Sequence, residues 1–256
     1  MVGELGGLYA IWYREIKVFL RETSRLVGAI VQPLMWLIIL GTGLGSVVEV
    51  GAVGAGTNYQ QFIFPGVLAM TILFGSLFFG MYIIFDKRVD FLKEVLVAPL
   101  SRTTIFFGKV LGGSTDGIIE IIVLMILGEL FFGIHFTVFS VVVTLLVIML
   151  LMTSIISLGL TIGSIMTSPE GFGLVTGFLI FPLFLLSGAL FPVKNLPSWL
   201  FGFVAVNPVS YAVDALRSTI LGIPSGFSLL IDFGVLILFA IVMVSIGTYA
   251  FKKMKF

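Results

Sequence analysis

The strongest constraint on this chain is its series of long stretches without a charged residue. They cover residues 26–48, 50–85, 136–169, 171–193 and 233–251. A helix needs about 20 apolar residues to cross a hydrocarbon core of about 30 Å. Only 11% of the 256 residues are charged and 59% are hydrophobic, which leaves too little polar surface to cover a water-soluble domain. The sequence therefore predicts a multi-pass membrane protein that forms a single transmembrane domain over residues 1–256.

A further apolar segment, 107–133, contains Asp116, Glu120 and Glu129. We count it as a span because the next segment could not otherwise keep its orientation. Backbone groups in lipid must be satisfied within the segment, so the spans are predicted to be helices and the fold class all-α. The alternating segments of about ten residues that mark a transmembrane barrel do not occur. Six spans result, near residues 26–46, 62–85, 107–133, 138–166, 171–192 and 228–251.

The basic residues fix the expected orientation. With six spans and the N-terminus inside, all 14 lysines and arginines except Lys194 and Arg217 lie on the cytoplasmic side or at its edge. This strong positive-inside bias predicts that both termini are cytoplasmic. No cleavable signal peptide is expected, because the first long apolar run begins only after Arg25 and follows a charged segment.

Residues 4–22 are predicted to form a helix that lies in the cytoplasmic membrane interface. Apolar residues repeat there at helical spacing within an arc of about 120°, and Arg14, Lys17 and Arg21 fall on the other side. The helix either serves only as a membrane anchor or also contacts a cytoplasmic partner. The apolar positions are Leu5, Leu8, Tyr9, Trp12, Ile16, Phe19 and Leu20.

The longest charged loop, 86–106, has a short apolar face formed by Phe91, Leu92, Val95 and Leu96 among charged residues. Pro99 ends this predicted helix, because proline disfavours helix at the residue before it. A short amphipathic helix in a cytoplasmic loop suits docking into a groove of another protein. The alternative is a solvated loop whose apolar face rests on the membrane.

Residues 193–224 are too apolar for an ordinary loop and too rich in proline for a span. Asn195 and Asn207 are candidate helix caps, and Pro197 and Pro208 suit a first helical turn. We expect two short helices, a hairpin over 194–221 that dips into the membrane from outside and is covered by protein or water. Its candidate functional residues are Trp199, Pro208, Tyr211, Asp214 and Arg217, with Asp214 and Arg217 spaced to pair on one helix face.

Two acids, Asp116 and Glu120, share one face of the third span, and an ionised acid near its middle costs about 2.5–3.5 kcal/mol. They either contact a substrate, proton or cation, or form a hydrogen-bonded pair that fixes helix packing. Among basic residues inside the membrane, only Lys109 is an expected partner. Glycines 108, 112, 113 and 117 are interpreted as helix-packing positions. Aromatic candidates for a transport pathway are Phe74, Phe78 and Tyr82 on the second span, with Phe178, Phe181 and Phe184 on the fifth.

Several chemistries have no signature in the sequence. Cysteine is absent and His135 is the only histidine, which removes thiolate sites and histidine-pair metal motifs. Neither a nucleotide-binding P-loop nor a serine-hydrolase motif occurs. No catalytic residue, metal site or bound cofactor is therefore expected in this chain. The net charge of +1 gives no indication of a nucleic-acid partner.

Three stretches carry a resemblance to the permease subunit of type-2 ABC transporters, the group that includes daunorubicin-resistance and polysaccharide exporters. They are FPGVLAM at 64–70, LKEVLVAPLSRTTIFFGKVLGG at 92–113, and LSGALFPVKNLPSWLFGFVAVNPVSYAVDALRSTILG at 186–222. The resemblance implies a homodimer in a prokaryotic plasma membrane, with two cytoplasmic ATPase subunits that hold ATP and magnesium. The pathway would form at the dimer interface, chiefly from spans two and five.

In the resembled family, the loop at 90–102 is a coupling helix that receives movement from the ATPase, with the helix at 4–22 beside it. The implied ATPase-coupling residues are Phe91, Lys93, Glu94, Leu96, Pro99, Arg102, Arg14 and Lys17. The cargo would be a hydrophobic drug or lipid-like molecule, or a lipid-linked glycan. The alternative function is an ATPase-independent ion-coupled carrier or channel that uses Asp116 and Glu120.

Overall fold

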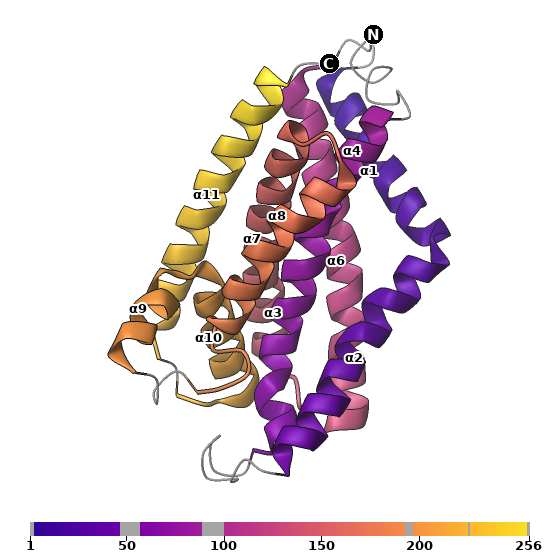
Figure 1. Ribbon diagram of the computed structural model, residues 1–256. Coiled ribbons are helices and arrows are strands. Elements are labelled where there is room, and N and C mark those ends of the chain that lie inside the picture. The colour runs from indigo at the N-terminus through magenta and orange to yellow at the C-terminus, as the bar shows by residue number, and fades with distance from the viewer. Residues whose placement is uncertain (1–2, 47–56, 89–99, 193–196, 225, 255–256) are drawn as a thin grey trace.

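The computed structural model describes residues 3–46, 57–88, 100–192, 197–224 and 226–254. Within these ranges the chain is helical and has no strand, as predicted. The N-terminal helix α1 (Glu4–Arg21) and the C-terminal end of the last helix lie at the same end of the helix bundle (Figure 1). This placement of the two ends agrees with the predicted even number of membrane crossings.

Five helices among the described residues are long and apolar enough to cross a membrane. They match the predicted first, second, third, fourth and sixth spans within a few residues. The second is an almost continuous pair that changes from α3 to α4 at Gly80. The five are α2 (Thr23–Gly45), α3 with α4 (Tyr59–Phe79 and Met81–Arg88), α6 (Arg102–Phe132), α7 (Val138–Ile165) and α11 (Leu229–Lys253).

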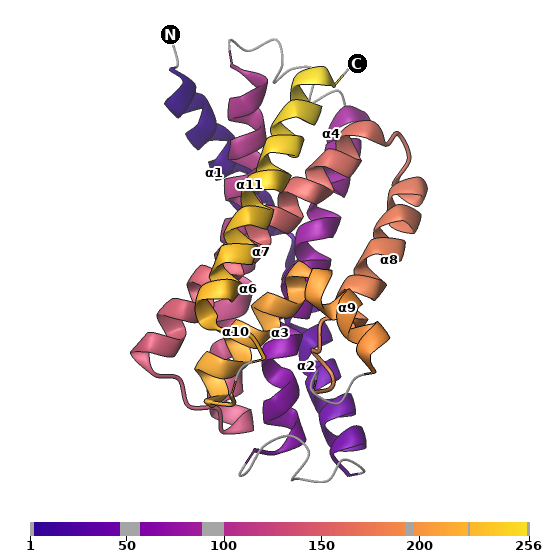
Figure 2. The same cartoon turned by 90° about the vertical axis from the view of Figure 1, so that its left-hand side faces the viewer.

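The predicted fifth span is shorter than expected. Helix α8 (Pro169–Leu185) begins after the side-chain cap of Ser168 and contains Pro182 in its last turn. The chain then turns at Gly188, whose φ of 72° favours glycine. Figure 2 shows α8 starting at the end of the bundle where the termini lie and descending toward α9. Its 17 residues place it just below the length of a full span.

Two short helices follow, as the prolines predicted. Helices α9 (Ser198–Val206) and α10 (Pro208–Leu221) meet at 90°. Asn207 caps α10 through a hydrogen bond from the Val209 N–H, and Pro208 occupies the first turn. Both helices lie in the half of the bundle away from the termini (Figure 2).

The predicted pair between Asp214 and Arg217 does not form. Asp214 accepts hydrogen bonds from the backbone N–H groups of Gly226 and Phe227, at 2.9 and 2.8 Å. Arg217 is buried and donates to the carbonyl oxygens of Gly188 and Ala189. Its guanidinium also lies 4.0 Å from the ring centroid of Phe62. Backbone N–H and C=O groups in the chain turns need hydrogen-bond partners where water is scarce. They therefore bind the two charged side chains, which do not pair with each other.

Two of the quoted sequence stretches, 64–70 and 186–222, contact each other in the core. A Cβ on Gly66 would lie 2.6 Å from the carbonyl oxygen of Ala189, so only glycine permits this approach. Tyr59 donates to the carbonyl oxygen of Leu190 at 2.8 Å. The turn after α8 is therefore held by α3 on one side and α10 on the other.

Helices α3 and α7 approach each other at three glycines. A Cβ on Gly80 would overlap the backbone of Gly159, and one on Gly163 would overlap the carbonyl oxygen of Gly80. Small residues at a crossing let helix backbones come together in a membrane, where packing rather than water drives association. This crossing places α3 and α4 in the centre of the described bundle.

We expect the Gly159→Leu variant to lose about 1–3 kcal/mol of stability, because its side chain overpacks the crossing. Gly234→Leu is the matched control, since a Cβ at Gly234 meets no atom within 4 Å. Thermal unfolding of the purified protein in detergent measures the difference. Equal melting temperatures for Gly159→Leu and the control would contradict the described crossing.

Candidate functional site

A cluster of four buried or half-buried charges joins three helices at the end of the bundle that holds the termini. Lys109 of α6 lies 3.0 Å from Glu15 of α1 and 2.6 Å from Asp86 of α4. Arg14 contacts the same two carboxylates, at 2.8 and 3.1 Å. Lys109 is only 1% exposed, and a charge so deeply buried requires partners of opposite sign.

This cluster lies on a buried face of α1 that the sequence analysis did not predict. The face of α1 that packs on α6 contains Gly7, Ile11, Glu15 and Phe19, and it overlaps the predicted apolar arc only at its edge. Gly108 and Gly112 of α6 make room for Ile11 and Glu15, which confirms their predicted packing role. The predicted apolar residues Leu5, Tyr9 and Leu20 remain exposed.

The described start of α6 is tied to the first and last helices. Glu4 of α1 accepts hydrogen bonds from the Ser101 N–H at 3.0 Å and from the hydroxyl of Thr104. Hydrogen bonds from Thr104 and Ser101 lower the pKa of the Glu4 carboxyl. Arg102 donates to the carbonyl oxygens of Phe251, Lys252 and Met254, the last at 2.6 Å.

The end of α4 is tied to α7 in a similar way. Lys87 donates to the carbonyl oxygens of Gly163 and Ser164 at 3.1 and 2.7 Å. A lysine suits this position because the last carbonyls of a helix lack partners and carry partial negative charge. Both described flanks of the predicted coupling loop are thus anchored, one on α1, α6 and α7 and the other on α1 and α11.

Of the eight predicted coupling residues, Arg14, Lys17 and Arg102 are described. Arg14 and Arg102 have the intramolecular contacts given above, while Lys17 is exposed and lies 4.5 Å from the Tyr13 ring centroid. The other five, namely Phe91, Lys93, Glu94, Leu96 and Pro99, lie outside the described residues.

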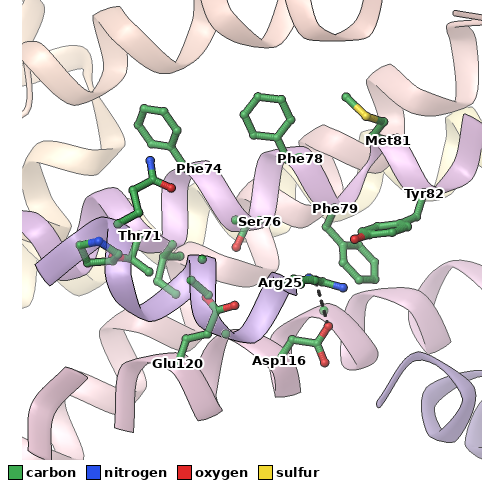
Figure 3. Close-up of a pocket in the computed structure, with 18 of the residues that line it drawn as sticks. Arg25, Thr71, Phe74, Ser76, Phe78, Phe79, Met81, Tyr82, Asp116 and Glu120 are labelled. Carbon is green, nitrogen blue, oxygen red and sulfur yellow. Dashed lines mark hydrogen bonds and ion pairs between the residues drawn. The ribbon is translucent and has the colours of Figure 1, made fainter. Parts of the chain in front are cut away.

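The two acids of the third span line a cavity of about 410 Å³ between α2, α3, α4 and α6 (Figure 3). Asp116 pairs with Arg25 of α2, with 3.2 Å between Nη2 and Oδ2. The expectation that only Lys109 is available as a basic partner was therefore wrong. Arg25 precedes the first apolar run, but the bend between α1 and α2 turns it inward, where its guanidinium lies 4.9 Å from the Tyr82 ring centroid.

The predicted pathway aromatics separate into two groups. Phe74, Phe78 and Tyr82 line the cavity. Phe178 and Phe181 of α8 are exposed, and Phe184 is buried against Trp36 with ring centroids 6.2 Å apart. Phe74 and Phe181 make an edge-to-face contact at 6.2 Å, so α8 adjoins the aromatic wall without forming it.

Most of the predicted functional residues of the hairpin make contacts that stabilise the fold. Tyr211 donates to the carbonyl oxygen of Ala205 at 2.7 Å, which braces the bend between α9 and α10. Asn207 donates to the carbonyl oxygen of Leu183 at 2.7 Å and so fixes the bend on α8. Trp199, by contrast, is exposed on α9.

Sequence reasoning missed Asp232, which lies fully buried in the first turn of α11. Neither of its carboxylate oxygens has a hydrogen-bond partner among the described residues. Sequence reasoning also missed Glu15 and Asp86 as partners of Lys109. The available signal was that each is an acid among apolar residues of a helix, but helical spacing alone does not show which of several helices they face.

Comparison with known proteins supplies the family. Residues 7–221 match the ABC-2 type transporter family. The chain is 32% identical over 242 residues to the inner membrane transport permease YadH of Escherichia coli, covering 91% of this chain and 90% of YadH. It is also 33% identical over 199 residues to the putative transport permease ycf38 of Cyanophora paradoxa, covering 77% of this chain and 68% of that protein.

A third relative is nodulation protein J of Rhizobium leguminosarum, 26% identical over 253 residues, with 97% of this chain and 95% of the relative covered. The chain belongs to the ABC-2 type transporter family and is a membrane-spanning transport permease. The resemblance based on the three sequence stretches is thereby confirmed.

We expect Lys109→Met to destabilise the protein by about 3–5 kcal/mol, because Glu15 and Asp86 would lose their buried partner. Lys17→Met is the matched control, since Lys17 is an exposed lysine on α1 outside the charge cluster. Thermal unfolding in detergent measures both variants. Equal stability of the two variants would show that the cluster contributes nothing to the fold.

Proposed function

We propose that this chain is the permease subunit of an ATP-driven exporter and that a separate cytoplasmic ATPase supplies the energy. Family membership supports the proposal, together with the absence of a nucleotide-binding P-loop from the sequence. In this proposal two permease copies pair and bind two ATPase subunits. The protein lies in a prokaryotic plasma membrane with both termini in the cytoplasm, as the positive-inside bias indicates.

The observation that carries the coupling proposal is the anchoring of both flanks of the loop. Before the loop, Asp86 and Lys87 contact α1, α6 and the end of α7. After it, Ser101 and Arg102 contact α1 and the end of α11. A force on residues 90–102 would therefore reach four helices through short polar contacts, which suits a rigid-body movement. ATP binding does work on the permease only if it favours one of two such arrangements.

Exposed apolar faces support a pathway between two permease copies. Phe178 is 82% exposed on α8, and the neighbouring α2 exposes Val31, Met35 and Ile39. Such faces contact lipid or a second protein. We propose that α3 and α8 of the two copies line the pathway and that α9 and α10 dip into its outer mouth. A hydrophobic drug, a lipid-like molecule or a lipid-linked glycan is the proposed cargo.

The alternative, an ion-coupled carrier that works without an ATPase, draws on Asp116 and Glu120 lining the cavity. Reconstituting the chain alone in proteoliposomes tests it. Full transport driven by an ion gradient, without any ATPase, would favour the carrier and contradict the exporter.

We expect Glu94→Lys to lower ATPase stimulation several-fold while leaving membrane insertion and stability intact. The physical reason is that charge reversal on the proposed docking helix disrupts the contact with the ATPase. The measurement is ATP hydrolysis by the co-purified complex with and without cargo, and Glu129→Lys, an exposed position on α6, is the control. Normal coupling in Glu94→Lys would count against the assignment of this loop.

A further inference from the structure

The cavity between α2, α3, α4 and α6 contains more negative than positive charge. Asp116 and Glu120 project into it from α6, and Arg25 enters from α2 (Figure 3). Arg25 forms an ion pair with Asp116, which satisfies one carboxylate. Glu22, the other charged residue of the wall, lies at an exposed position where water satisfies it. The second buried carboxylate, Glu120, is left without a matching charge.

Glu120 is deeply buried and yet makes no hydrogen bond or ion pair with any described residue. Its exposed fraction is 8%, and its Oε2 lies 3.7 Å from the position that a Cβ on Gly75 would take. The carboxyl group therefore faces α3 across the cavity, where glycine leaves space beside it. Asp116 is 2% exposed, and its Oδ1 likewise has no partner in the described part of the chain. Glu120 is therefore the unpaired carboxylate of the cavity wall, and one oxygen of Asp116 is also left without a partner.

The rest of the wall determines what kind of positive charge fits. Phe74, Phe78 and Tyr82 supply aromatic surface, and Ser76 adds one hydroxyl. Aromatic faces attract organic cations, especially where water is excluded. A volume of about 410 Å³ matches the range of small-molecule sites. An inorganic ion would require several oxygen ligands around it, and among the described residues no group of three or more Asp, Glu, His or Cys side chains is arranged to hold a metal ion.

We propose that this cavity within a single subunit binds a monovalent organic cation with an aromatic or apolar body. The positive charge lies against Glu120, beside the Arg25–Asp116 pair, and the apolar body lies along Phe74 and Phe78. The claim that this cation is transported cargo rests on the proposed export function. The claim that the cavity binds the cation does not.

Tetraphenylphosphonium is a suitable probe, because it is a permanent aromatic monocation and its size-matched counterpart tetraphenylborate is an anion. Binding of the radiolabelled cation is measured on the full chain in nanodiscs of uncharged phosphatidylcholine, with empty nanodiscs correcting for partition into lipid. We expect saturable binding of the cation, and no saturable binding of tetraphenylborate when the anion is measured in separate samples. No ATPase is present, so this result is separate from the outcome of the coupling experiment.

The decisive variant is Glu120→Gln, which keeps the shape of the side chain and removes its charge. It is expected to weaken binding by at least about tenfold, since one partner of a buried charge pair is lost. Glu129→Gln is the matched control, because Glu129 lies exposed on the same helix outside the cavity, and it should bind like the unmodified chain. Equal affinity of the two variants would overturn the proposal.

A second variant keeps the proposal testable if Glu120→Gln fails to insert. Gly75→Leu fills the cavity from α3 without changing any charge, and Gly43→Leu, where a Cβ meets no atom within 4 Å, is its control. Loss of binding in Gly75→Leu alone supports the site. Retained binding overturns it, as does the absence of saturable binding in the unmodified chain.

Discussion

The structure depends on the need to neutralise charge where water is scarce. Lys109 sits near the start of a long apolar helix with its ammonium buried, and only Glu15 and Asp86 make that position tolerable. Because these carboxylates belong to α1 and α4, the neutralisation also determines where those two helices lie. The same requirement places Arg25 against Asp116 and Arg217 against the carbonyls of the turn after α8. Each of these three cations therefore fixes a junction between segments that are distant in sequence.

These junctions divide the molecule into two functional regions. Near the termini, polar contacts connect α1, α4, α6, α7 and α11 around the two flanks of the charged loop. At the other end, Tyr59, Asn207 and Arg217 hold the turn after α8 against α3 and α10. The cavity with Glu120 lies between the two regions, next to aromatic residues of α3.

The sequence predicted the helices well because the span signal is local. Apolar length, caps such as Asn207, and glycines such as Gly108 act within a few residues of their position. The partners of the charges were predicted poorly. Glu15 was assigned no partner, and Asp214 was paired with Arg217, although each contacts groups elsewhere in the chain. Such pairings depend on how the helices are rotated relative to each other. Helical periodicity predicts which side chains share one face of a helix, but not which other helix packs against that face. For the same reason the sequence indicated that Asp116 and Glu120 share a helix face. It did not show that Asp116 pairs with Arg25 while Glu120 lines the cavity.

The glycine crossing of α3 and α7 has a mechanical consequence. Gly80, Gly159 and Gly163 bring the two backbones into direct contact, with no flexible side chains between them to absorb displacement. Sliding or tilting one helix against the other would force main-chain atoms together, so we expect the two helices to move as one rigid unit. Any change of shape during a transport cycle must then be taken up at the periphery. The short α8 and the part of α2 beyond the Arg25–Asp116 pair lie at that periphery (Figures 1 and 2), and we expect them to take up the movement.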